Sequence, residues 1–275
     1  AISRQVRGLE VELRQSLLLR NGRGATPTEA GKRLLDHARS ILQQVERARR
    51  DVDEAKGAPV GQVVIGMPPS LALALTAPIV REFRRRYPRA SVSIVEGLSV
   101  HLHEWVAVGR VDVGVLYNPP SSPAVELRPL VDEPLCLISR RDARSRAATI
   151  RLRDLPGFPL IIPSRPNAIR ALVEARLAAL GARPQVALEI DAIGPILELV
   201  AEGQGHAVLS RRAIDGADVR RKLVARPIAQ PPLTTSLALA ISAQRPATPV
   251  QDAAVALVEE LARTHPAERR APRSR

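Results

Sequence analysis

Cysteine is almost absent from this chain, since Cys136 is the only one in 275 residues. A single thiol forms neither an internal disulfide nor a cysteine-rich metal site, and this usage is typical of a reducing compartment. Aromatic residues make up only 2% of the chain, which argues against a surface that stacks the bases of single-stranded nucleic acid. No apolar run approaches the roughly 18 residues of a membrane span, and no signal segment opens the chain. We therefore expect a cytoplasmic protein with no membrane partner.

Acidic residues are outnumbered, with 28 Asp and Glu against 41 Lys and Arg and a formal net charge of +13. Only three of the basic residues are lysines, and this arginine skew resembles genomic base composition more than selection for a ligand. The position of the charge is more informative. Residues 1–50 carry 11 basic and 5 acidic side chains, whereas residues 57–262 carry 24 and 19. A local excess of this kind favours a polyanionic partner at the N-terminal end.

The N-terminal segment has helical periodicity, because Val6, Leu9 and Leu13 fall on one face. The chain opens on Ala1 in the middle of this pattern, so we expect that upstream sequence is missing. A basic, turn-rich loop, Arg-Asn-Gly-Arg-Gly, follows at residues 20–24.

A long helix is predicted to begin after Thr28, a suitable N-cap between Pro27 and the acidic Glu29. Its apolar residues alternate between spacings of four and three: Leu34, Ala38, Ile41, Val45, Ala48, Val52 and Ala55. Such an a/d heptad seam predicts a coiled-coil dimerisation helix, and the alternative is one long helix folded back on its own domain. The Gly-Ala-Pro sequence at 57–59 would end the helix and serve as a linker.

From residue 60 the pattern alternates between strand and helix. Over residues 62–117 the order strand, helix, strand, helix, strand predicts a parallel sheet with helices on its faces. Two further strands are expected at 125–130 and 135–139. A second α/β unit is expected over 160–209, and the remaining elements are strands at 223–228 and 237–241 and a helix at 250–263.

The two α/β units share a local design, in which an apolar strand leads through a Pro/Ser turn into a helix. The sequences are Ile-Gly-Met-Pro-Pro-Ser at 65–70 and Leu-Ile-Ile-Pro-Ser-Arg-Pro at 160–166. Helix N-termini carry unpaired N–H groups and a positive dipole end, so both turns suit an anion. Two such turns facing each other predict a ligand cleft between two lobes.

The N-terminal motifs are the most specific feature of the chain. Ala-Ile-Ser-Arg-Gln-Val-Arg-Gly-Leu-Glu at 1–10 is followed by the 20–24 loop and by Thr-Pro-Thr-Glu-Ala-Gly at 26–31. In this order, and joined to the heptad seam, they resemble the winged helix-turn-helix end of LysR-type transcriptional regulators. The resemblance continues through 96–97, 109–112 and 199–205, and Pro-Ser-Arg-Pro at 163–166 is similar to the branch that includes nitrogen-assimilation regulators. Family members begin about thirty residues earlier, so the front of the helix-turn-helix is expected to be absent.

This resemblance implies an α/β protein with a partial winged helix-turn-helix DNA-binding domain at 1–26 and a coiled-coil linker helix at 27–57. A two-lobed effector-binding domain, similar to periplasmic binding proteins, would follow at 60–264. Lobe I would comprise 60–133 and 234–264, and lobe II 134–233. Residues 265–275 are expected to form a disordered basic tail.

The resemblance also implies a set of residues that contact DNA: Ser3, Arg4, Gln5, Arg7, Arg23 and Thr28. The first two would lie on the recognition helix, where Arg grips guanine through two hydrogen bonds and Ser reaches a base or a phosphate. Gln5 and Arg7 would contact phosphates. Arg23, at the wing tip, would enter a minor groove, and Thr28 would bind a phosphate while it caps its helix. The alternative for each is a solvated surface side chain.

A second set is expected to bind the effector: Ser70, Ser99, Ser164, Arg165, Asn167, Ile193 and Gly194. Ser70 and Ser99 fall in the first two strand-to-helix turns, where the family places ligand-binding hydroxyls, although both could simply cap helices. Arg165 would pair with a carboxylate of the ligand, or else be solvated.

Other candidate sites are weaker. Gly203-Gln204-Gly205 follows a helix and precedes a strand, the reverse of a dinucleotide fingerprint. His101 and His103 point to different faces of a helix, which argues against a metal site, and Cys136 lies in an apolar strand as a core residue. We find no nucleophile elbow, P-loop or paired carboxylates, and so expect no catalysis, no metal and no cofactor.

The sequence therefore predicts a DNA-binding transcriptional regulator controlled by a small, anionic metabolite bound between two lobes. Its expected partners are double-stranded DNA for the full-length protein, the effector, a second copy in a homodimer or a tetramer, and RNA polymerase. The alternative function is a two-lobed solute-binding protein with no role on DNA, which should carry a signal segment and lack the heptad seam.

Overall fold

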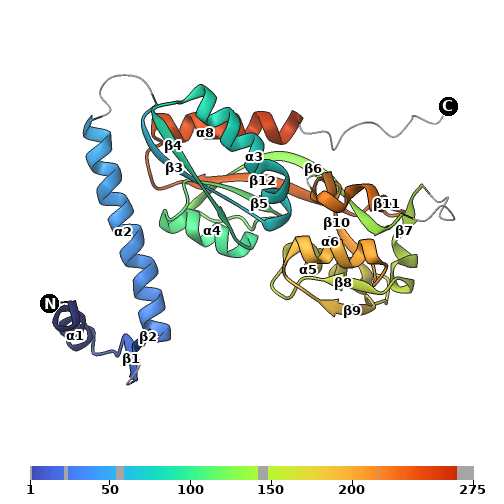
Figure 1. The fold of residues 1–275 in the computed structure, drawn as a ribbon, viewed down its shortest axis with the longest axis horizontal. Helices are drawn as coiled ribbons and strands as arrows, with labels where there is room; N and C mark the ends of the chain where they lie inside the picture. The colour runs from blue at the N-terminus through green and yellow to red at the C-terminus, as the bar shows by residue number, and fades with distance from the viewer. Residues whose placement is uncertain (1, 22–23, 54–58, 142–147, 216, 265–275) are drawn as a thin grey trace.

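The computed structural model describes residues 2–21, 24–53, 59–141, 148–215 and 217–264. A small N-terminal unit leads into a long helix, and two α/β lobes follow side by side (Figure 1). The elements in chain order are α1 (Ile2–Leu13), β1 (Leu18–Asn21), β2 (Gly24–Pro27), α2 (Glu29–Asp53), β3 (Gly61–Met67), α3 (Pro69–Arg86), β4 (Ala90–Glu96), α4 (Ser99–Val108), β5 (Val113–Tyr117), β6 (Val125–Arg140), β7 (Ile150–Arg151), η1 (Leu152–Gly157), β8 (Leu160–Ile162), α5 (Ala168–Ala178), β9 (Val186–Glu189), α6 (Ile193–Glu202), β10 (Ala207–Ser210), α7 (Arg212–Asp215), η2 (Asp218–Lys222), β11 (Leu223–Ala229), β12 (Thr234–Ser242) and α8 (Pro249–Thr264).

The N-terminal unit consists of α1 and the antiparallel hairpin β1–β2. Glu10 joins the two, because its Oε1 accepts the backbone N–H groups of Leu17 at 2.8 Å and Leu18 at 3.0 Å. The hydrogen bonds from Leu18 and Leu17 hold the pKa of Glu10 below its usual value, since they favour the ionised carboxylate. The end of the helix and the start of the hairpin are thus fixed by one side chain.

Thr28 caps α2, as predicted. Its Oγ1 accepts the N–H of Gly31 at 3.0 Å, while its own hydroxyl donates to the carbonyl of Ser16 at 2.7 Å. Gly31 lies directly against the preceding chain, where an added Cβ would be 2.0 Å from the carbonyl oxygen of Leu17. The Thr-Glu-Ala-Gly motif therefore holds the long helix against the hairpin.

Helix α2 confirms the predicted long helix over Glu29–Asp53, and Ala55 lies outside the described residues. It stands clear of the two lobes (Figure 1), so the alternative of a helix folded back on its own domain is wrong. Ile41 is 61% exposed and Leu42 66% exposed, and Val45 is exposed beside them. An apolar row of this size on a helix normally packs against a partner.

The predicted parallel sheet is confirmed, with β3 paired in parallel to both β4 and β5. The eight-stranded sheet has the order β4-β3-β5-β12-β6-β11-β7, and β10 also pairs with β6. Helices α3 and α8 pack on one face of the first lobe and α4 on the other (Figure 1). In the second lobe β8 and β9 pair in parallel, and a bridge between Leu160 and His206 links β8 to the start of β10.

The prediction of two strands at 125–130 and 135–139 is wrong, because β6 is one strand that runs through both lobes. Its first part pairs with β12, and its second part pairs with β10 and β11. Pro129 and Pro134 lie inside it although proline cannot donate to a strand ladder. The register with β12 shifts between Leu237 and Ala238, opposite this proline-containing segment, and the shift keeps the strand continuous.

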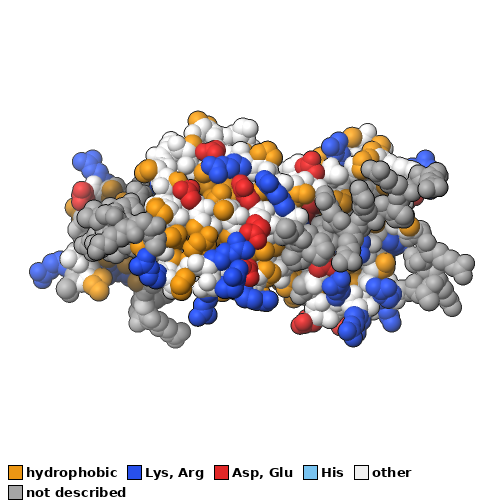
Figure 2. Space-filling view, turned by 90° about the horizontal axis from the view of Figure 1, so that it is seen from above, with side chains coloured by type: hydrophobic (Ala, Val, Ile, Leu, Met, Phe, Trp, Pro, Cys, Tyr) orange, Lys and Arg blue, Asp and Glu red, His pale blue; other side chains and the backbone are white. Residues whose placement is uncertain are grey.

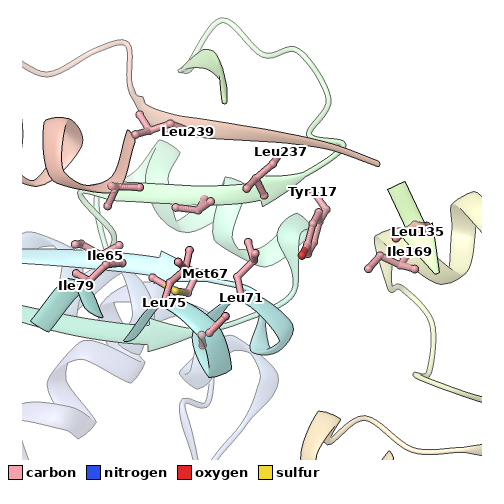
Figure 3. Packing of buried hydrophobic residues seen from close by; sticks show 14 of the residues in the cluster. Ile65, Met67, Leu71, Leu75, Ile79, Tyr117, Leu135, Ile169, Leu237 and Leu239 are labelled. Carbon is pink, nitrogen blue, oxygen red and sulfur yellow. The ribbon is translucent and has the colours of Figure 1, made fainter. Parts of the chain in front are cut away.

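The main hydrophobic core is continuous across the two lobes. In the first lobe Ile65, Met67 and Leu75 are fully buried between the sheet and α3 (Figure 3). The same cluster extends to Leu135 and Ile169 of the second lobe. The lobes thus share part of their packing as well as strand β6.

Several motif residues that carry the resemblance have structural roles. Gly109 and Gly203 end α4 and α6 with φ values of 76° and 88°, a left-handed backbone that glycine adopts without strain. Asp112 is buried, and its Oδ2 accepts the N–H of Val64 at 2.7 Å. This bond fixes the turn before β5 to strand β3.

Charged side chains of both signs are spread over the face seen in Figure 2, with basic groups at several separate places. Many arginines pair with carboxylates, for example Arg86 with Glu260 and Arg151 with Asp154. Within the described part of the chain, no helix is both long and apolar enough to span a membrane.

We predict that Gly31→Ala loosens the hairpin from α2, because the new methyl group would meet the backbone of Leu17 rather than a flexible side chain. The cost of such overpacking is about 1–3 kcal/mol. Hydrogen exchange at the Thr28 amide, which donates to the Leu17 carbonyl at 2.9 Å, would report it as faster exchange. Gly8→Ala is the control, because a Cβ at that helical position meets no atom within 4 Å. Equal protection of the Thr28 amide in both variants would contradict the role assigned to Gly31.

Candidate functional site

A cavity opens where the two lobes meet, and it encloses about 530 Å³, part of which is open to solvent. Its position between two lobes is typical of a small-ligand site. Both lobes contribute to its wall: Pro68, Pro69, Ser70, Leu98, Ser99, Tyr117, Pro163, Asn167, Ala168, Ile169, Asp191, Ile193, Val208 and Leu209.

The N-terminal turns of four helices reach this wall. Residues at the starts of α3, α4, α5 and α6 all line the cavity. The N-cap residues of α3, α4 and α6 are Pro68, Leu98 and Ala192, and none makes a side-chain capping hydrogen bond. Uncapped helix N-termini present N–H donors and a positive dipole end, so the cavity is suited to receive an anionic group.

Ser70 and Ser99 do not cap their helices, which contradicts that alternative, since each lies within the first turn after the N-cap. Both instead meet Tyr117 at the end of β5. The Ser99 Oγ accepts the backbone N–H of Tyr117 at 3.0 Å, and the Ser70 hydroxyl lies 3.5 Å from the Tyr117 hydroxyl. Burial, and secondarily the charge of Glu133, raises the pKa of Tyr117, so its hydroxyl stays protonated.

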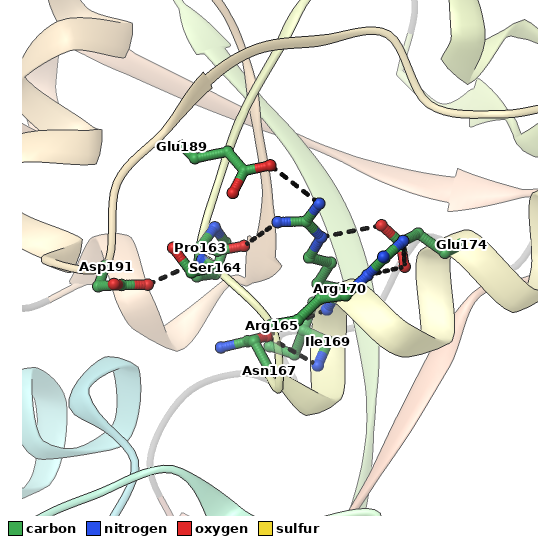
Figure 4. Close-up of polar contacts among 9 residues, drawn as sticks. All are labelled: Pro163, Ser164, Arg165, Asn167, Ile169, Arg170, Glu174, Glu189 and Asp191. Carbon is green, nitrogen blue, oxygen red and sulfur yellow. Dashed lines mark hydrogen bonds and ion pairs between the residues drawn. The ribbon is translucent and has the colours of Figure 1, made fainter.

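The opposite wall includes the turn between β8 and α5 in the second lobe (Figure 4). Asn167 caps α5, because its Oδ1 accepts the N–H groups of Ile169 and Arg170, both at 3.0 Å. Arg165 extends away from the cavity and pairs with Glu174 at 2.9 Å, and its side chain is 71% exposed.

Arg170 is the buried cation of this turn. Its guanidinium pairs with Glu174 at 2.8 Å and with Glu189 at 3.0 Å, and it donates to the carbonyl of Pro163 at 2.9 Å. Because these contacts tie α5 to β9 and to the end of β8, the turn is a rigid part of the wall.

The structure brings four of the seven predicted effector-binding residues to the cavity, namely Ser70, Ser99, Asn167 and Ile193. The other three, Ser164, Arg165 and Gly194, do not line it. The sequence reading missed Tyr117 and Asp191. Tyr117 ends strand β5 and Asp191 lies two residues after β9, and the C-terminal ends of strands are where an α/β sheet places ligand-binding residues. That position was the available signal.

The predicted DNA-contacting residues Ser3, Arg4, Gln5 and Arg7 are all exposed on α1. Arg20 of the hairpin donates from Nη1 to the Ser3 hydroxyl at 2.9 Å, and so joins this surface to β1. The hydroxyl proton of Thr28 is directed to Ser16, as described above, and Arg23 lies outside the described residues.

The remaining candidates have structural explanations. Cys136 is buried as predicted, and burial raises the pKa of its thiol to about 11, which keeps it protonated and unreactive. His206 contacts Ser139 at 2.8 Å, and burial, with Arg226 nearby, lowers its pKa. Among the described residues there is no group of three or more His, Cys, Asp or Glu side chains that could hold a metal ion.

Comparison with known proteins identifies close matches along the chain. A family model described as the LysR substrate binding domain matches residues 56–263. The nitrogen assimilation regulatory protein nac of Klebsiella aerogenes is 34% identical over 253 residues, which is 90% of this chain and 81% of that protein.

Solved structures show the same fold. The LysR family transcriptional regulator CbnR matches with a TM-score of 0.71 at 22% identity, over 95% of this chain and 89% of that one. CbnR complexed with its target DNA matches with a TM-score of 0.62 at 22% identity, over the same shares of the two chains. The CcmR regulatory domain of Synechocystis PCC6803, in complex with 2-PG, has a TM-score of 0.66 at 19% identity and covers 74% of this chain and 99% of that one.

We predict that Ser99→Ala destabilises the first lobe by about 1–3 kcal/mol, because it leaves the buried N–H of Tyr117 without its acceptor. Ser70→Ala is the matched control and should cost less, since the 3.5 Å contact of Ser70 is long for a hydroxyl pair. Urea denaturation followed by the fluorescence of Trp105, the single tryptophan and a residue of α4, measures both. Equal losses would show that the bond to Tyr117 does not distinguish the two serines.

Proposed function

The chain belongs to the LysR family of DNA-binding transcriptional regulators, and we propose that it is a homodimer whose hold on DNA responds to a metabolite in the interlobe cavity. The observation that carries this proposal is the arrangement of the chain, in which α1 and the hairpin lie at one end of α2 and the two lobes lie beyond the other end (Figure 1). A cavity is present where the two lobes meet. LysR proteins are regulators and not enzymes. The alternative of a solute-binding protein is not supported, because the match to a regulator covers 90% of the chain.

The proposed division of labour follows the domains expected from the sequence: DNA binding at 1–26, dimerisation at 27–57, and effector binding at 60–264 in lobes of 60–133 with 234–264 and of 134–233. A protein that works in this way acts where the DNA is, in the cytoplasm.

DNA recognition is assigned to α1 and the hairpin. Four polar or basic side chains of α1 face solvent, and Arg20 lies beside them through its bond to Ser3. CbnR, which shares the fold, has been crystallised with target DNA. Arg4 would read a base edge and Ser3 would reach a base or a phosphate. Gln5, Arg7 and Thr28 would contact phosphates, and Arg23 would enter a minor groove.

The effector is assigned to the cavity. Three helix N-termini without side-chain caps and the hydroxyls of Ser70 and Ser99 support a ligand with an anionic group. The regulatory domain of CcmR, with the same fold, was solved in complex with 2-PG. A ligand that contacts both lobes would favour one relative arrangement of them, and this shift in population would change the dimer and the spacing or bend of its DNA.

The dimer is assigned to α2. Leu34, Ala38, Ile41 and Val45 form one row along the helix, which Ala48, Val52 and Ala55 continue in the sequence. The described part of the row is exposed to half-buried in the single chain. Pairing two such rows would bury it as a coiled coil, and a tetramer and contact with RNA polymerase are further expected assemblies.

We predict that Ile41→Asp dissociates the dimer, because a carboxylate would have to be buried in the seam. Arg39→Asp places the same side chain on the exposed opposite side of α2 and should leave the dimer intact. Sedimentation equilibrium over a range of concentrations measures the association constant. A monomer for the unsubstituted protein at all concentrations, or an Ile41→Asp dimer of unchanged stability, would exclude this seam.

We predict that Arg4→Ala in the full-length protein costs about 1–3 kcal/mol at a duplex selected from a random pool and relaxes preference at one base pair. Arg7→Ala is the comparison. It should lower the affinity for selected and scrambled duplexes alike, and it should reduce the dependence of affinity on salt concentration by the amount expected for about one phosphate contact. Equilibrium binding at several salt concentrations separates the two behaviours. A uniform loss for Arg4→Ala would remove it from base reading.

A further inference from the structure

The charges around the cavity are unevenly distributed. Asp191 is the one residue with a formal charge among those that line it, all of which belong to the described part of the chain. The arginines of the neighbouring turn pair with carboxylates, since Arg165 pairs with Glu174 and Arg170 with Glu174 and Glu189 (Figure 4). An anion in the cavity would therefore meet helix N-termini and hydroxyls, while a carboxylate stands at the opposite wall.

Asp191 is held in place at this wall. It is an exposed residue between β9 and α6, and its Oδ1 accepts the N–H of Ser164 at 2.7 Å. The bond uses one of its two carboxylate oxygens and fixes the side chain beside the cavity. Asp191 also precedes the first residue of α6 by two positions, so its charge offsets the positive end of that helix.

The facing wall has the opposite character. It carries the starts of α3 and α4, neither with a side-chain cap, and the hydroxyls of Ser70 and Ser99. The rest of the lining is mainly apolar, with Leu98, Ile193 and Val208 among its members. A matching ligand has an anionic end, a cationic end and a small apolar body.

We propose that the effector is a zwitterion of the α-amino acid class, with its carboxylate at the starts of α3 and α4 and its ammonium group on Asp191. This inference rests on the proposed function, which places the effector in this cavity. A plain organic acid would be repelled by the carboxylate of Asp191, whereas a zwitterion has a partner both for this carboxylate and for the helix starts on the facing wall.

The test compares small apolar amino acids with the carboxylic acids that lack only the amino group, such as alanine with propionate, valine with 3-methylbutanoate and leucine with 4-methylpentanoate. Calorimetric titration and thermal shift are measured on the whole chain. We expect at least one amino acid to bind about tenfold or more tightly than its deaminated partner, the effect of one charge-assisted hydrogen bond.

Asp191→Asn should abolish that difference. Asparagine keeps an oxygen that can accept the Ser164 N–H, so the turn should stay folded while the charge is removed. The amino acid should lose about tenfold in affinity and the deaminated acid should bind as before or more tightly. Glu198→Gln is the matched control, because Glu198 is an exposed carboxylate of α6 that does not line the cavity.

Three outcomes overturn the inference: no amino acid of the panel binds, the deaminated acids bind equally well, or Asp191→Asn and Glu198→Gln behave alike. Failure of the proposed function has a different signature. In that case an amino acid would bind through Asp191, but the affinity of the full-length protein for its selected DNA would not change.

Discussion

The two lobes are joined around a buried ion pair between Glu133 and Arg212. Both side chains are only 2% exposed, and Arg212 also donates from Nη2 to the carbonyl of Ala262 at 2.6 Å. Glu133 lies in the middle of β6, where the strand passes from one lobe to the other, while Arg212 begins α7 and Ala262 belongs to α8. Loss of either partner would leave the other charge buried and unpaired, at a cost of about 3–5 kcal/mol, so the pair fixes how these three elements meet.

This junction adjoins the cavity. Tyr117, which lines the cavity and meets both serines, is buried within range of the charge of Glu133. Helix α7 packs against α3, the helix whose first turn forms part of the cavity wall. A ligand that moves α3 or Tyr117 therefore acts on the elements that set the relation of the lobes. The proposed response to the effector thus has a short physical route from the cavity to the junction of the two lobes, through neighbouring groups.

The elements that sequence reasoning predicted are those with local signals. The alternation of strands and helices over 62–117, the Thr28 cap and the long α2 helix each follow from neighbouring residues, and the structure has them. The continuity of β6 could not be predicted in this way. The strand stays continuous despite its prolines because it pairs with β10, β11 and β12, and these segments are distant in sequence.

The same reasoning explains the errors at the site. Ser70, Ser99, Asn167 and Ile193 were found because turns before helices are recognisable in sequence. The orientation of Arg165 depends on Glu174, nine residues further along the chain. Nothing local marks Glu133 and Arg212 as partners. Arg165, the predicted partner of a ligand carboxylate, does not line the cavity, where helix starts take that role and Asp191 adds a negative charge. For this reason the proposed ligand is a zwitterion and not a simple anion.

The net charge of +13 can be understood from these contacts. In the lobes many arginines are matched to carboxylates, as Arg86, Arg165 and Arg170 are. Among the described residues, no lysine or arginine lines the cavity. The basic character of the effector-binding region is therefore not a property of its ligand site. On α1, by contrast, Arg4 and Arg7 face solvent on the helix that also carries Ser3, next to the hairpin with Arg20. Because this surface combines positive charge with a helix and a hairpin, the composition supports DNA binding through the position of a few arginines and not through their total.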